Sequence, residues 1–256
     1  RSPRAMLSMF RRVVLTGIGA GLFAGLLVTF VQAFTTIPLI VAAEVYETGD
    51  VHDHGPEARL DGSLLVLAHS TVGEPAALPG EPEPVSLERR LSTLVANLVT
   101  GAGFGLLLAG AMTLAGHGFT PQRGLLWGIA GFATFTLAPS LGLAPEVPGA
   151  VTADLAARQA WWLMTAGLTA AGLALILLSG RSLLALLGIV ALALPHVIGS
   201  PAAGIHGGAV PPELAAEFVS ASLVSQAIFW AVLGYAVGWI GQRMDAPAPD
   251  RLPQPA

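Results

Sequence analysis

Long apolar stretches separated by shorter polar segments recur six times along the 256 residues of the chain. A helix needs roughly 20 apolar residues to cross the hydrocarbon core of a membrane, and the stretches are close to that length. The pattern predicts an all-α, polytopic membrane protein with six transmembrane helices. The predicted spans are Val13–Ile40, Leu91–Leu114, Leu125–Leu143, Ala160–Leu178, Leu183–Ile198 and Phe218–Ile240.

The first stretch admits a second interpretation. Arg11 and Arg12 precede it and small residues lie around Ala33, a combination that is also typical of a secretory signal. The apolar part of a signal is about 7 to 15 residues long, and this run is longer. We therefore interpret it as a membrane helix.

The composition also indicates a membrane protein. Hydrophobic residues make up 54% of the chain and charged residues 11%, and the mean hydropathy is +0.70, whereas soluble domains carry about 25% charged residues. The chain has no Cys, and all 12 cationic side chains are Arg. This excludes disulfides and thiolate chemistry, so any metal would have to bind imidazole, carboxylate or backbone oxygen.

Arginines are distributed unevenly between the two sides of the predicted spans. More of them lie on the side of the termini, which the positive-inside rule places in the cytoplasm of a multi-pass inner-membrane protein. Of the 16 acidic residues, only Asp245 and Asp250 share that side. The arginines of the terminal side are Arg1, Arg4, Arg11, Arg12, Arg123, Arg181, Arg243 and Arg251, and the others are Arg59, Arg89, Arg90 and Arg158.

These boundaries divide the chain into a membrane domain, residues 9–243, and two terminal segments, 1–8 and 244–256, which we predict to be disordered. The membrane domain includes a long external loop, 44–88, rich in Pro, Gly and acidic residues. Proline lacks the amide hydrogen that helices and strands use. We therefore expect little regular structure in this loop.

Two proline pairs with equal spacing suggest an internal repeat. Pro139 and Pro145 close the third span as Pro195 and Pro201 close the fifth. The following spans each open with an acidic residue, which favours the positive end of a helix dipole. The repeat predicts three helical hairpins, although Ala, Leu and Pro are so abundant here that chance matches are an alternative.

The stretch EVYETGDVHDHGPE, residues 44–57, places carboxylates and imidazoles at the outer mouth of the first span. Together these groups suit divalent first-row metals, and a loop can gather them without a preformed scaffold. A solvated acidic loop that happens to contain two histidines is the alternative. The candidate metal ligands here are Glu44, Glu47, His52, Asp53 and His54.

His196 follows Pro195 near the outer end of the fifth span. It could be an interfacial histidine, a second metal ligand, or an axial ligand to haem or a related pigment. The sequence leaves these three possibilities open.

The predicted spans contain no charged residue, so a carboxylate-driven pump is not indicated. Their polar side chains can bond across helix interfaces or line a path together with carbonyls freed by prolines. Glycines repeated every four residues from Gly17, and at Gly101 and Gly105, predict close helix packing. No Ser-His-Asp, Walker or HExxH arrangement supports an enzyme. The polar residues are Gln32, Asn97, Gln159, Ser220, Ser222, Ser225 and Gln226.

Several short motifs also occur in one order along the chain. They are MFRR from Met9, AEVYE from Ala43, HDH from His52, LLWGIAGFATFTLAPSLGLAPEVPG from Leu125, AARQAWW from Ala156, LPHVIGSP from Leu194 and FW in the last span. From Met9 to about Arg243 this order resembles the CbtA family, the predicted membrane subunit of a cobalt transporter.

The resemblance implies six membrane helices, cobalt uptake for cobalamin synthesis, and a small single-helix partner, CbtB, with a histidine-rich motif. The resemblance implies that the metal is handled first by Glu44, Glu47, His52, Asp53 and His54. His196 is a secondary candidate ligand.

We therefore expect a non-enzymatic membrane protein that captures Co²⁺, or alternatively Ni²⁺, at the external loop and moves it inward. Membrane lipid, the CbtB-like subunit and a second copy of the chain are the expected partners, and nucleic acid is not. The rival hypothesis is a non-transporting accessory subunit of a larger complex, one that binds haem or a pigment.

Overall fold

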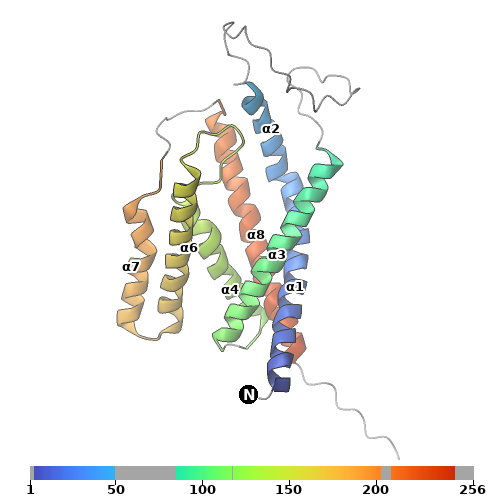
Figure 1. Ribbon diagram of the computed structural model, residues 1–256, viewed down its shortest axis with the longest axis vertical. Coiled ribbons are helices and arrows are strands. Elements are labelled where there is room, and N and C mark those ends of the chain that lie inside the picture. Colours follow the sequence, from blue (N-terminus) through green and yellow to red (C-terminus); the bar gives the residue numbers. More distant parts are fainter. Residues whose placement is uncertain (1–2, 50–84, 117, 203–208, 246–256) are drawn as a thin grey trace, which may run out of the picture.

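The computed structural model describes residues 3–49, 85–116, 118–202 and 209–245. Within these ranges the protein is helical and has no strand, which confirms the predicted all-α class (Figure 1). The elements are α1 (Pro3–Phe34), α2 (Thr36–Gly49), α3 (Leu87–Leu114), α4 (Pro121–Phe132), the π-helical segment η2 (Ala133–Leu137), α5 (Ala138–Ser140), α6 (Leu155–Leu178), α7 (Ser182–Ile198) and α8 (Pro212–Asp245).

Four of these helices, α1, α3, α6 and α8, are long and apolar enough to cross a membrane. The predicted span Leu183–Ile198 coincides with α7, whose 17 residues extend about 26 Å, slightly less than the ~30 Å hydrocarbon core. The predicted span Leu125–Leu143 falls on α4, η2 and α5, where the α-helix changes to a π-helix at Ala133. Crossing by these two segments therefore stays a prediction.

The first predicted span, Val13–Ile40, is divided at Thr35, between α1 and α2. Pro38 explains the break, because proline cannot donate to the carbonyl one turn earlier but is tolerated in the first turn of a helix. The Thr35 hydroxyl donates to the carbonyl of Val31 at 2.9 Å. Figure 1 shows α2 continuing in the direction of α1.

The two ends of the described chain lie together. Arg12 in α1 forms an ion pair with Asp245 in α8, and its guanidinium lies 5.3 Å from the ring centre of Phe119. We call this end of the bundle the terminal end, and the opposite end, where α2 stops and α3 begins, the loop end (Figure 1). An even number of membrane crossings would place both termini at the same end of the bundle, as is seen here.

Helix occupies parts of both segments that the sequence predicts to be disordered. α1 begins at Pro3, within residues 1–8, and α8 ends at Asp245, within residues 244–256.

Glycine faces join the helices in close pairs. In α1 and α3, a Cβ atom added to Gly21 would overlap the carbonyl oxygen of Gly101, so the two backbones touch as the glycine spacing predicts. A Cβ atom on Gly172 in α6 would lie 2.7 Å from the carbonyl oxygen of Gly188 in α7. The same kind of contact joins α4 and α8, through Gly124, Gly128, Gly234 and Gly238.

The helices do not all pack on their neighbours in sequence. The first hairpin is present as α1 packed on α3, but α4 packs mainly on α8, and α6 packs mainly on α7. No Cα atom of α7 lies within 8 Å of one in α8, so these two helices do not pack on each other, and the third hairpin stays a prediction. Glycine contacts accompany each observed pairing, and in α4 it is Gly124 and Gly128 that meet the backbone of α8.

The bundle therefore has two parts. A core of α1, α3, α4 and α8 encloses the main apolar cluster, which includes Met112, Trp230 and Leu233. The hairpin of α6 and α7 meets this core chiefly through η2 and α5, and it lies along one side of the bundle in Figure 1. The space between hairpin and core holds the cavities described below.

Candidate functional site

An ion pair closes the loop end between α2 and α3. Arg89, in the first turn of α3, donates to both carboxylate oxygens of Glu44, at 2.5 and 3.0 Å. Glu44 lies beyond the first predicted span. These hydrogen bonds, and the positive charge behind them, lower the pKa of Glu44 below its ordinary value. This carboxylate, predicted as a metal ligand, is thus ionised and already bound by a cation.

The other predicted loop ligands are placed only in part. Glu47 belongs to α2, close to its end, while His52, Asp53 and His54 lie outside the described residues. Within the described ranges, no three side chains among His, Cys, Asp and Glu gather into a metal-binding group. The loop site thus stays a prediction.

His196 lies in the last turn of α7, and its ring meets the buried Trp161 edge-on, with centroids 6.0 Å apart. This contact joins the ends of α6 and α7 that lie toward the loop end. It fits the interfacial interpretation of His196 and leaves the metal and pigment interpretations as predictions.

Several polar side chains within the spans bond across helix interfaces, as predicted. The amide of Asn97 in α3 donates to Gln32 at 2.7 Å and to Thr29 at 3.0 Å, both in α1. The hydroxyls of Thr35 and Ser225 lie 3.1 Å apart and connect the α1–α2 junction to α8. These side chains are structural connections between helices of the core.

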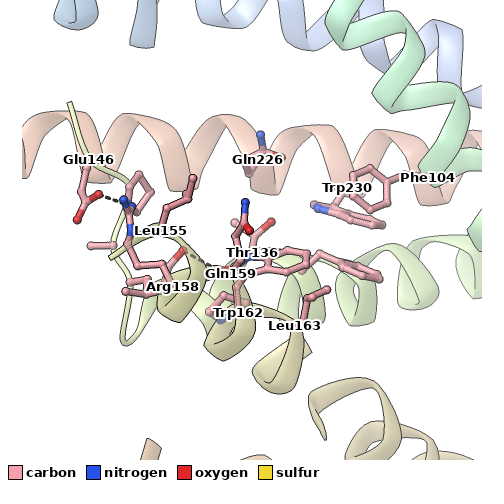
Figure 2. A pocket seen from close by; sticks show the side chains of 16 residues that line it. Phe104, Thr136, Glu146, Leu155, Arg158, Gln159, Trp162, Leu163, Gln226 and Trp230 are labelled. Atoms are coloured by element: carbon pink, nitrogen blue, oxygen red, sulfur yellow. Dashed lines mark hydrogen bonds and ion pairs between the residues drawn. The ribbon is translucent and has the colours of Figure 1, made fainter. Parts of the chain in front are cut away.

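Other polar side chains instead face a cavity of about 750 Å³ between the core and α6, which we call the α6 vestibule. It lies toward the loop end, since part of its wall is the α5–α6 connection (Figure 2). Pro139, one of the prolines expected to free a carbonyl, lines it beside η2, and π-helical segments are frequent at functional sites. Its polar lining residues are Thr136, Ser140, Glu146, Arg158, Gln159 and Gln226.

The rim and the floor of the vestibule differ in chemistry. At one end, Glu146 and Arg158 form an ion pair, with 31% and 26% of their side chains exposed. Phe104 and Trp230 lie at the other end (Figure 2), and Phe135 also lines the cavity. The rings of Phe135 and Trp230 are stacked with centroids 5.6 Å apart. A charged rim thus leads to an aromatic floor deep in the bundle.

A second cavity, of about 650 Å³, lies between α3, α4 and α6 on the terminal side of that floor. Apart from Arg123 and Thr134, apolar and aromatic side chains line it, and Phe135 and Trp230 border both cavities. The aromatic floor therefore separates a polar space from an apolar one.

Glu146 and Arg158 were not among the candidates chosen from the sequence. Arg158 contributed only to the count of arginines, and Glu146 only to the count of acids. The motif that contains Pro139, Pro145 and Glu146, followed 12 residues later by Arg158, was the available signal. The resemblance already included both stretches.

Comparison with known proteins identifies a protein family. The family model described as "Probable cobalt transporter subunit (CbtA)" matches residues 10–242. No curated protein and no solved structure matches the chain. The family match spans nearly all of the described helices, including both walls of the α6 vestibule. The chain belongs to the CbtA family of probable cobalt transporter subunits.

Proposed function

We propose that the protein imports a divalent transition-metal cation, Co²⁺ in the first place and Ni²⁺ in the second, in support of cobalamin synthesis. The observation that carries this proposal is the α6 vestibule: a polar, partly exposed cavity bordered by helices of a cobalt transporter family. Its volume accommodates a hydrated ion many times over, because one water occupies about 30 Å³. The ion can enter before it loses its water shell.

In this proposal the loop end faces the outside of the inner membrane and both termini are cytoplasmic. The segments α4, η2 and α5 run without interruption from Pro121 to Ser140, about 30 Å, and complete six crossings with α7. Inward movement of a divalent cation gains about 4.6 kcal/mol per 100 mV of membrane potential, since each charge contributes about 2.3.

We propose that Glu47, His52, Asp53 and His54 capture the ion ahead of the vestibule. Glu44 joins them only by giving up Arg89, and His196 is a secondary ligand on α7. Ligands on a loop bind the ion only weakly, which suits transport because the ion must leave as readily as it enters.

The family description supports an assembly, since it names a subunit. We propose that the partner is a small single-helix, histidine-rich protein of the CbtB kind. An accessory role without transport is the alternative, and haem or pigment binding would appear as visible absorbance of the purified protein.

The test is radioactive Co²⁺ uptake by liposomes containing the protein, with and without the partner, under an inside-negative potential. We expect potential-dependent uptake above that of empty liposomes, reduced several-fold in His52→Ala/His54→Ala. Uptake equal to empty liposomes under both conditions would favour the accessory role. Full uptake by the double variant would exclude the loop from the mechanism and leave transport standing.

A further inference from the structure

Two charged side chains, Glu146 and Arg158, line the α6 vestibule, and they are bonded to each other. Glu146 lies in the connection after α5, whereas Arg158 lies in the first turn of α6. The pair thus links the α5–α6 connection to the first turn of α6, on a helix that has few contacts with the core. Its net charge is zero, so an arriving cation meets a carboxylate that is already neutralised.

The wall of the same vestibule also carries neutral oxygen-bearing side chains. Ser140 donates its hydroxyl hydrogen to the Thr136 carbonyl at 2.7 Å, so the Ser140 oxygen presents only lone pairs to other groups. Gln159 lies one residue beyond Arg158 on α6, and its side chain also lines the cavity (Figure 2). Carboxylate, hydroxyl and amide oxygens, together with waters, are the ligand types that suit a hydrated divalent cation.

We infer that Glu146 is a cation-binding residue and that Arg158 is a tethered cation occupying its place when the vestibule is empty. This inference rests on the proposed function and names a site within it. The incoming divalent ion takes the carboxylate from Arg158. The guanidinium, on a long side chain in an exposed first turn, then moves into solvent.

If this exchange occurs, substitutions of the two residues should change the Co²⁺ affinity in opposite directions. Removing Arg158 removes a competitor, so Arg158→Gln should bind Co²⁺ more tightly, by up to about fivefold, the upper end of what a partly exposed ion pair contributes. Removing Glu146 removes the site, so Glu146→Gln should bind about tenfold more weakly or worse. A pair with a purely structural role would instead affect binding in the same direction in both variants.

The measurement is Co²⁺ quenching of tryptophan fluorescence in the purified full-length protein, since Trp162 and Trp230 line the vestibule. All variants are made in a His52→Ala/His54→Ala background, which removes both proposed loop imidazoles from every sample alike. The matched control is the ion pair at the terminal end, where Arg12→Gln should leave the Co²⁺ dissociation constant unchanged. Glu146→Asp keeps the charge and should retain most of the binding.

A tighter Arg158→Gln together with a weaker Glu146→Gln supports the exchange. Weaker binding by Arg158→Gln, or unchanged binding by Glu146→Gln, overturns it. If Glu146→Gln does not fold, the inference is tested with Arg158→Gln and Glu146→Asp. Loss of Co²⁺ binding in either of these variants contradicts it. The binding measurement does not depend on transport. If binding changes as predicted but the protein takes up no Co²⁺, the proposed function is refuted and the exchange stands. If the protein takes up Co²⁺ but binding is unchanged in both variants, the exchange is refuted and the proposed function stands.

Discussion

The interface between α1 and α3 and the surface between α6 and the core are built in opposite ways. Along α1 and α3, glycines bring the two backbones into contact, and the amide of Asn97 bonds across to α1. Along α6, contact with the core is limited chiefly to η2 and α5, and two cavities fill the remaining length. The tight interface suits a fixed frame, and the open one suits binding and movement.

The comparison also separates the two ion pairs at the loop end. Glu44 and Arg89 join the frame's α3 to α2 by two hydrogen bonds. Glu146 and Arg158 link the α5–α6 connection to α6 at the rim of a cavity. The first ion pair thus holds two helices together, whereas the second lies at the entrance to a cavity.

The largest expected effect comes from breaking the frame. Gly101→Val places side-chain atoms on the carbonyl oxygen of Gly21, and such overpacking costs about 1–3 kcal/mol or more. We expect a strongly lowered yield of monodisperse protein and a lowered Tm. Gly103→Val, on the same helix but with no atom near the added Cβ, is the control, and equal losses in both would show that the α1–α3 contact is not tight.

A second, smaller effect distinguishes polar groups that hold helices from polar groups that face the vestibule. Asn97→Ala loses two interhelical hydrogen bonds and should lower the free energy of unfolding by about 0.6–1.7 kcal/mol, with unchanged Co²⁺ uptake per folded molecule. Gln159→Ala removes an exposed amide that lines the vestibule and should leave the Tm unchanged while reducing uptake several-fold. Thermal melts and liposome uptake measure both, and an exchange of these two outcomes would reverse the assignment.

Sequence reasoning was strongest where one residue type implies one packing rule. The glycine repeat at Gly17 and Gly101 predicted close backbones, and the amide at Asn97 predicted a bond across helices. It failed where geometry depends on residues far apart along the chain. The contact between Gly124 and Gly234 could not be read from spacing, because each glycine face has several possible partners, and consecutive helices seemed the natural ones.

The candidate site shows the same division. Gln159, Gln226 and Pro139 were expected to line any path, and all three line the α6 vestibule. The pairing of Glu146 with Arg158 was missed because each was counted only as a charge on one side of a membrane. The π-helical segment was also missed, since it reflects how Pro139 is accommodated by the preceding turn and not any residue pattern in Ala133–Leu137.

The smallest effect is the pH dependence of the brace between α2 and α3. Arg89 holds the pKa of Glu44 below its ordinary value of 4.5, so the unfolded chain binds this proton more readily than the folded one. The stabilisation is therefore complete above about pH 4.5 and is lost as the pH falls through the lower, folded-state pKa. Because both side chains are over a third exposed, solvent screening keeps the effect small.

The measurement is the Tm of wild type and Glu44→Gln in the same detergent from neutral pH down to pH 3. We expect wild type to be slightly more stable at neutral pH and the difference to shrink toward zero on acidification. A difference that is constant with pH would mean that the Arg89 contact is not electrostatic, and one that grows would give Glu44 a raised pKa. The Glu146→Gln difference, followed in parallel, shows whether the vestibule rim depends on charge for stability as the brace does, or keeps its carboxylate chiefly for binding.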